Sequence, residues 1–249
     1  MKRLLLILSI VMLFMVGCSG KNDGNEKFKA MVVKSYESGL MAINLDKELS
    51  IGMFDPISVG YKNKLTLETG DIVEIKFDGL IRESYPVQIT ASNVKLIEKA
   101  EGGWPASAMI PKDYTYEDAV LDKNLVVGHS EVEGKDHLNI FVGNSVAGMV
   151  SFLRVVAYTI EGDPIIKDIL FDGKTYYGVH DNTRDAFGSQ SITIYEYPYL
   201  NTYEKDGKLV VYLANRNDIT DVEFEKSMES DREEDRIDMF VIYEEYVAD

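Results

Sequence analysis

Short apolar stretches separated by polar breaks recur in the chain from residue 28 onward. They cover residues 28–36, 39–44, 49–54, 71–77 and 94–97, and the fourth alternates apolar and charged side chains before it closes on Asp78-Gly79. Alternation with a period of two indicates half-buried β-strands, and regularly spaced short strands are typical of a small barrel or sandwich. We therefore predict an all-β domain over residues 28–99.

Residues 100–113 separate this region from the rest of the chain. The segment contains Gly102-Gly103, two prolines and several small residues, a composition that favours a linker. Trp104 is the only tryptophan, and we expect it to anchor the linker on a domain rather than to contact a ligand.

The pattern after residue 113 mixes helices and strands. Thr115 followed by acidic residues predicts the start of a short helix, and apolar residues at helical spacing predict an amphipathic helix over 135–148. Asp172-Gly173 lies between two β-branched and aromatic runs, which predicts a β-hairpin. The predicted strands cover residues 125–127, 150–159, 165–171, 175–179, 191–197, 208–214 and 237–246, whereas the highly charged residues 215–236 favour a solvated helix or a mobile loop. We predict an α+β domain with a mostly antiparallel sheet over residues 114–249.

The amino terminus has the layout of a secretory signal: Lys2-Arg3, an apolar run over residues 4–16, then Gly17-Cys18. Residues 15–18 resemble the lipobox of bacterial lipoproteins, in which the cysteine receives a diacylglyceryl group. Cys18 is also the only cysteine, so no disulfide can use it within the chain. We predict a signal peptide over 1–17, a lipid on Cys18, a flexible tether over 18–27, and a location on the extracytoplasmic face of the cell membrane. The alternatives are an uncleaved anchor and an ordinary signal with an incidental cysteine.

Charge excludes one class of partner. The formal net charge is −16 at pH 7, and removal of a signal containing Lys2 and Arg3 makes the mature chain more acidic still. Such a surface repels nucleic-acid phosphates and anionic lipid headgroups. We therefore expect no nucleic-acid binding, and we expect the lipid on Cys18 to hold the protein at the bilayer. A protein or cell-wall ligand remains open.

The ends of the predicted hairpin gather the candidate binding residues, which are Glu161, Asp163, Asp181, Arg184 and Asp185. Residues 181–185 begin like an EF-hand, yet the sixth position is Ala186 and the twelfth is Ile192, which excludes that motif. Two interpretations stay open: a looser calcium site, and ordinary turns with an ion pair to Arg184. No metal or other cofactor is expected.

Catalytic motifs are scarce. The chain has three histidines and no HExxH, Cys18 is assigned to the lipid, and the segment around Ser145 lacks the second glycine of a nucleophile elbow. The leading hypothesis is therefore an extracytoplasmic binding or interaction module. The alternative is a cell-wall hydrolase that uses two carboxylates among Glu161, Asp163 and Asp185.

Two stretches resemble lipoprotein families of unknown function. The strand ending in Asp78-Gly79 and the turn at residues 83–89 resemble domain of unknown function 3221, which implies an OB-like barrel over about residues 28–99. Residues 158–165, 171–173 and 181–188, with the helix start at Tyr114-Thr115, resemble domain of unknown function 4362. Both resemblances imply export and lipid anchoring, and neither implies a reaction.

Overall fold

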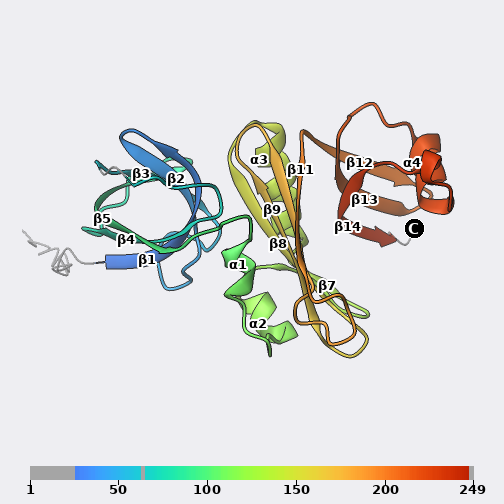
Figure 1. Ribbon diagram of the computed structural model, residues 1–249, viewed down its shortest axis with the longest axis horizontal. Coiled ribbons are helices and arrows are strands. Elements are labelled where there is room, and N and C mark those ends of the chain that lie inside the picture. The colour runs from blue at the N-terminus through green and yellow to red at the C-terminus, as the bar shows by residue number, and fades with distance from the viewer. Residues whose placement is uncertain (1–25, 63–64, 247–249) are drawn as a thin grey trace, which may run out of the picture.

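The computed structural model describes residues 26–62 and 65–246, and β-strands make up most of it. A barrel, a six-stranded sheet and a three-stranded sheet follow one another along the longest axis of the molecule (Figure 1). The few helices lie beside the two sheets. A mostly β structure with a barrel in its N-terminal part confirms that part of the sequence prediction.

Five strands close the N-terminal barrel in the order β1-β2-β3-β5-β4. These are β1 (Glu26–Tyr36), β2 (Gly39–Asn44), β3 (Pro56–Gly60), β4 (Ile72–Phe77) and β5 (Val87–Glu98). β3 pairs with β5 in parallel, and every other neighbouring pair is antiparallel. Inward-facing Phe28, Ile57, Ile75 and Phe77 fill the barrel, as the apolar alternation predicts.

The prediction of a strand over residues 49–54 is wrong. The side chain of Asn44 is buried there and donates to the carbonyls of Asp46, Ile51 and Gly52 at 2.9–3.1 Å. These bonds fold the segment into turns, and Phe54 takes a φ of 70°. An asparagine that satisfies backbone carbonyls competes with strand pairing, so the third strand begins only at Pro56.

The central sheet has the order β11-β10-β9-β8-β6-β7. Its strands are β6 (Leu125–Val127), β7 (Val132–Glu133), β8 (Ser151–Tyr158), β9 (Pro164–Phe171), β10 (Tyr176–Asp181) and β11 (Ile192–Tyr197). The predicted hairpin is present as β9 and β10, with Gly173 at a φ of 96° in the turn. Helix α3 (Lys135–Val146) packs Leu138 and Phe141 against the sheet, so Ser145 lies inside a helix as expected.

The C-terminal sheet consists of β12 (Tyr199–Lys205), β13 (Lys208–Ala214) and β14 (Met239–Tyr246). Helix α4 (Asp221–Glu229) covers it through Phe224, which stacks on Tyr203 at 4.4 Å between ring centroids. The 3-10 helix η1 (Glu233–Asp235) follows. Strand β12 was not predicted. Its burial pattern is irregular, and only pairing with β13 makes it a strand.

Two short helices connect the barrel to the central sheet: α1 (Pro105–Ala108) and α2 (Tyr116–Leu121). Thr115 caps α2 as predicted, in a reciprocal pair of bonds with Asp118. Trp104–Ser107 are buried in the segment expected to be a linker. Trp104 belongs to an apolar cluster with Met31 and Ile43 of the barrel and with Phe152 and Leu170 of the central sheet. The barrel and the sheet therefore share buried surface at this joint.

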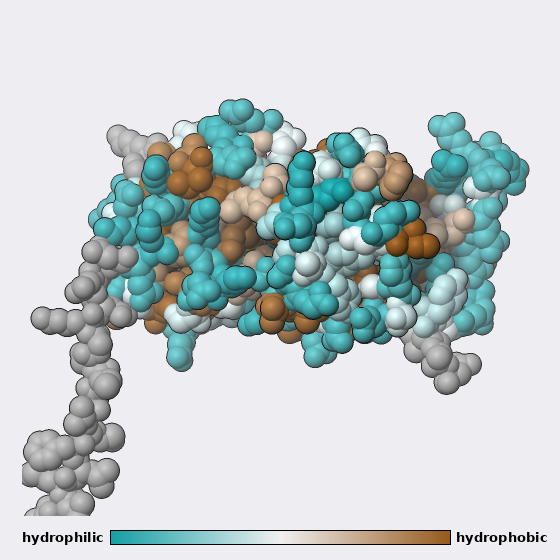
Figure 2. Space-filling view, turned by 90° about the horizontal axis from the view of Figure 1, so that it is seen from below, coloured by the Kyte–Doolittle hydropathy of each residue, from teal (hydrophilic) through white to brown (hydrophobic). Residues whose placement is uncertain are grey.

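Cys18 and the predicted signal peptide lie outside the described residues. Within 26–62 and 65–246, no helix has both the length and the apolar character needed to cross a membrane. The visible surface is mainly hydrophilic, with apolar groups in a recess between the barrel and the central part (Figure 2).

Candidate ligand-binding cleft at the barrel–sheet joint

The acidic residues singled out at the hairpin ends take separate roles in turns. Asp163 accepts from the backbone N–H of Ala186 at 2.9 Å, and Asp185 accepts from the N–H of Phe187 at 2.9 Å. Glu161 is exposed on its turn. Among the described residues, no group of three or more His, Cys, Asp or Glu side chains is placed to hold a metal ion. The geometry therefore matches the turn interpretation of these residues.

Asp181 and Arg184 form a buried ion pair, with the Arg184 Nη1 3.1 Å from an Asp181 carboxylate oxygen. The side chain of Arg184 is 4% exposed and that of Asp181 is 0% exposed. Arg184 also donates to the carbonyl oxygens of Ser107, Ile110 and Pro111 at 2.6–3.2 Å. Burial acts to raise the pKa of Asp181, but hydrogen bonds from Thr183 and Ser107, together with Arg184, lower it overall. This pair ties the end of the hairpin to the segment after α1.

A second buried ion pair was not anticipated from the sequence. Arg154 on β8 stands directly opposite Asp168 on β9, and two bonds of 2.6 and 2.7 Å join the guanidinium to the carboxylate. The side chains are 2% and 0% exposed. Trp104 Nε1 donates to Asp168 at 2.9 Å, and Arg154 Nη2 donates to the carbonyl of Ala106 at 3.0 Å. The pair thus joins the sheet to α1.

Arg154 keeps unused hydrogen-bonding capacity. Its Nε and Nη2 make all of its hydrogen bonds, and Nη1 makes none in the described part of the chain. The rings of Phe54 and Phe152 lie 5.3 and 5.8 Å from its guanidinium carbon. Burial opposes the charge, but Asp168 more than offsets burial, so the pKa of Arg154 is raised and the side chain stays cationic.

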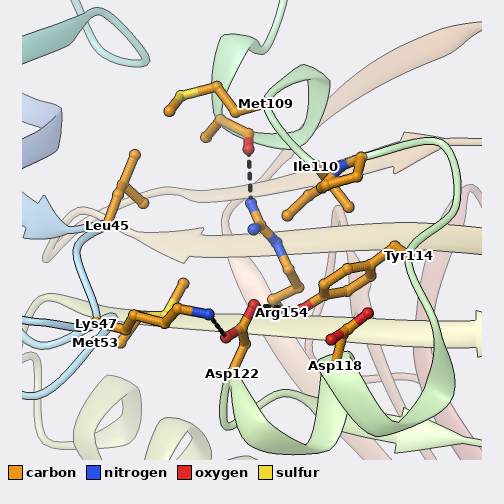
Figure 3. Close-up of a pocket in the computed structure, with 11 residues that line it drawn as sticks. Leu45, Lys47, Met53, Met109, Ile110, Tyr114, Asp118, Asp122 and Arg154 are labelled. Atoms are coloured by element: carbon orange, nitrogen blue, oxygen red, sulfur yellow. Dashed lines mark hydrogen bonds and ion pairs between the residues drawn. The ribbon is translucent and has the colours of Figure 1, made fainter.

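A cleft of about 330 Å³ opens over Arg154, and we call it the joint cleft. Leu45, Lys47 and Met53 line it from the barrel, and residues of α1, α2 and the segment between them line the other side. Figure 3 shows Lys47 reaching Asp122 from the barrel side, while Arg154 extends toward α1. Apolar and charged side chains thus face one another across the cleft. Its lining is Leu45, Lys47, Met53, Ala106, Met109, Ile110, Pro111, Tyr114, Asp118, Asp122 and Arg154.

The charged groups of the joint cleft are arranged in pairs. Lys47 Nζ lies 3.1 Å from Asp122, and this hydrogen bond raises the pKa of Lys47. The Tyr114 hydroxyl donates to the same carboxylate at 2.9 Å. Burial, and then the neighbouring Asp122, raises the pKa of Tyr114, so its hydroxyl stays protonated at neutral pH. The cleft therefore presents the cations Arg154 and Lys47 and the carboxylates Asp118 and Asp122 beside an apolar wall.

Arg154 also lines a smaller cavity of about 110 Å³ on the α3 side of the joint. Tyr85 lies there, and its hydroxyl accepts from Asn144 at 2.7 Å. Burial raises the pKa of Asp55, which faces the same cavity. The guanidinium thus borders two cavities formed where the barrel meets the central sheet.

The sequence did contain a signal for this site. Arg154 and Asp168 are charged residues inside two strongly apolar strand patterns, and charged groups in such positions are buried only when they are paired. Their equal distances from Glu161, in the turn between β8 and β9, place them opposite each other in an antiparallel ladder. Lys47 and Asp122 carried no comparable signal, because only the docking of the barrel brings them together.

Comparison with known proteins adds a family relationship for part of this site. A comparison with curated proteins finds no match. The family model described as domain of unknown function (DUF4362) matches residues 122–212, a stretch that contains Arg154, Asp168, Asp181 and Arg184. The resemblance stated from the sequence is confirmed over these residues, and this part of the chain is similar to that family.

Proposed function

We propose that the protein is a bacterial lipoprotein, held on the extracytoplasmic face of the cell membrane by a lipid on Cys18, that binds a small amphipathic carboxylate in the joint cleft. Support for the anchor comes from the signal layout of residues 1–18. The closed five-stranded barrel and the resemblance to domain of unknown function 3221 support an OB-like first domain, with an α+β second domain over 114–249.

The single observation that carries the ligand proposal is the unpaired Nη1 of the buried Arg154. A ligand carboxylate at Nη1 gains a charge-assisted hydrogen bond, and such bonds contribute about 1.5–3 kcal/mol. Lys47 supplies a second cation at the rim of the joint cleft. Leu45, Met53, Met109 and Ile110 supply an apolar wall for the rest of the molecule.

Ligand binding in the joint cleft can be followed by the fluorescence of Trp104. It is the only tryptophan in the chain and donates its indole N–H to Asp168, which in turn pairs with Arg154. Its fluorescence therefore reports on Arg154 in the joint cleft through Asp168. We expect octanoate to change the Trp104 emission saturably in the purified Cys18→Ser chain, and octanol and octylamine to leave it unchanged.

Two variants test whether Arg154 and Lys47 bind the octanoate carboxylate. Arg154→Lys keeps a cation opposite Asp168 but removes the free Nη1, and Lys47→Met removes the second cation. We expect each to weaken octanoate binding by about tenfold or more, in line with a lost charge-assisted bond. Lys27→Met is the matched control, because Lys27 pairs with Glu74 on the barrel outside the joint cleft. Equal binding of octanol, or full binding by Arg154→Lys, would contradict the proposal.

The anchor has its own test. Wild-type protein should remain with membranes after a carbonate wash, and Cys18→Ser should be released, since two acyl chains hold a protein stably and no other anchor is proposed. Retention of Cys18→Ser on washed membranes would contradict lipid attachment at this residue.

A further inference from the structure

A second cavity, separate from the joint cleft, lies on the other side of Tyr114. It has a volume of about 530 Å³, within the range of small-molecule sites. Tyr114, Tyr116 and Tyr158 contribute to its wall together with His129, Glu131 and Asp163. Asp163 is one of the residues expected to bind a ligand, but none of the groups that carry the joint-cleft proposal, Arg154, Lys47 and Trp104, faces this space. We call it the tyrosine cavity.

The three tyrosines are held by backbone and capping interactions. Tyr116 begins α2 directly after the Thr115 cap, and Tyr158 ends β8. The Tyr158 hydroxyl donates to the carbonyl of Tyr114 at 3.2 Å, and the rings of Tyr116 and Tyr158 lie 5.9 Å apart at 50°. A Cβ on Gly128 would stand 3.0 Å from the Tyr116 ring, so a larger residue there would require the ring to shift. The aromatic wall is therefore fixed in position.

One polar atom of this wall is left without a partner. The Tyr116 hydroxyl is buried and makes no hydrogen bond with any group that the structure describes. An unsatisfied buried hydroxyl destabilises a fold, because its hydrogen bonds to water are lost without replacement. A buried polar group without a hydrogen-bond partner calls for an explanation, and a functional role is one recognised explanation. This packing is not what stability alone would select.

The tyrosine cavity is also acidic. Asp113, Glu131 and Asp163 line it against a single Lys112. Asp163 uses one carboxylate oxygen to accept from Ala186, and its other oxygen makes no hydrogen bond in the described part of the chain. Burial raises the pKa of Tyr116, and the nearby Glu131, Glu133 and Glu117 raise it further, which reports the negative potential around the ring.

We propose that the tyrosine cavity binds an organic ammonium cation, such as a quaternary ammonium headgroup. Ring faces attract a cation through their quadrupole, and the attraction is stronger when the ammonium is desolvated. The carboxylate of Asp163 supplies the opposite charge without a fixed cation of its own. A metal ion is the poorer match, since no group of three ligating side chains among the described residues is placed to hold one.

Choline and its neutral isostere 3,3-dimethylbutan-1-ol test this proposal, because they share shape and hydroxyl and differ in charge. Calorimetric titration of the purified Cys18→Ser chain, at matched ionic strength, should show saturable choline binding in the micromolar to millimolar range and none for the neutral isostere. Equal binding of both compounds, or no saturable choline binding, would overturn the proposal. Neither result bears on octanoate binding, which is read at Trp104.

Variants separate the contributions of the aromatic rings and of the carboxylate to choline binding. Tyr158→Leu removes a ring face and Asp163→Asn removes a charge, and each should weaken choline binding about tenfold. Tyr158→Phe keeps the ring but removes the hydrogen bond to the Tyr114 carbonyl, so it should weaken choline binding less than Tyr158→Leu does. Glu161→Gln is the matched control, since Glu161 lies on the same turn as Asp163 but does not line the tyrosine cavity. If Tyr158→Leu does not fold by circular dichroism, Asp163→Asn decides, and its wild-type affinity would refute the assignment.

Discussion

The two buried arginine–aspartate pairs contain the same residue types but differ in how many guanidinium donors the chain itself satisfies. Arg184 spends every N–H of its guanidinium, on Asp181, Thr183 and three backbone carbonyls. Arg154 donates to Asp168 and to one carbonyl and keeps Nη1 unpaired. Both pairs hold the segment around α1, and Arg154 borders the joint cleft and the smaller cavity beside α3.

The difference shows that burial of a charge does not by itself mark a site. A buried pair whose donors are all satisfied by the chain closes a loop, because nothing is left for a ligand to bond. A buried pair with a remaining donor beside a cavity is prepared for an anion. Substitutions at the two pairs, acid and calcium each test this contrast, with expected effects that run from the largest to the smallest.

Arg154→Met should have the largest effect on stability. It leaves the fully buried Asp168 with Trp104 as its one remaining donor, and removal of one partner of a buried pair destabilises by about 3–5 kcal/mol. For a chain of this length the melting temperature should fall by about 10 °C. Thermal and urea unfolding measure both quantities.

The double variant Arg154→Met with Asp168→Asn is the control. It removes both charges and keeps an acceptor for Trp104, so much of the lost stability should return. Additive destabilisation by the two substitutions would mean that the pair contributes packing rather than charge compensation.

Arg184→Met should cost less, about 2–3 kcal/mol, because Asp181 keeps two hydrogen bonds from Thr183. It should not change octanoate binding at Trp104, since Arg184 does not line the joint cleft. Urea unfolding measures the loss of stability, and the fluorescence titration measures octanoate binding. A loss of octanoate binding equal to that of Arg154→Lys would erase the proposed distinction between the pairs.

Lowering the pH should reveal how much ionised Asp181 contributes to the free energy of unfolding. The folded pKa of Asp181 lies below the ordinary value of 3.8, so its stabilisation is complete above that pH and is lost as the pH falls through the lower, folded value. The difference in unfolding free energy between wild type and Asp181→Asn should therefore shrink below pH 3.8. A difference that stays constant between pH 6 and pH 3 would show that the charge of Asp181 contributes nothing.

Calcium should have the smallest effect. Asp181 uses both carboxylate oxygens on Thr183 and Arg184, and Asp163 and Asp185 each accept from a backbone N–H. Among the described residues, no group of three or more ligating side chains is placed to hold a metal ion. Millimolar calcium should leave the melting curve unchanged. A shift of several degrees that disappears in the Asp181→Asn, Asp185→Asn double variant would instead establish a calcium site at the hairpin end.

The hairpin residues show how far local sequence rules reach. Asp172-Gly173 between two strand-like runs was sufficient to predict β9 and β10, and Thr115 with Asp118 was sufficient to predict the start of α2. These features depend on bonds within a few residues. The prediction for residues 49–54 failed because the deciding bonds come from the buried Asn44, whose side chain the apolar pattern ignores.

The sequence by itself determined the strand-rich character of the chain, the hairpin and the capped helix, because local periodicity and turn chemistry depend on neighbouring residues. Only the tertiary structure decided which polar residues form the sites. Lys47 meets Asp122 across 75 positions of sequence, and Trp104 meets Asp168 across 64. Such contacts exist because the barrel and the sheet bury apolar surface against each other, and that docking, not any local pattern, places Arg154 at the floor of a cleft.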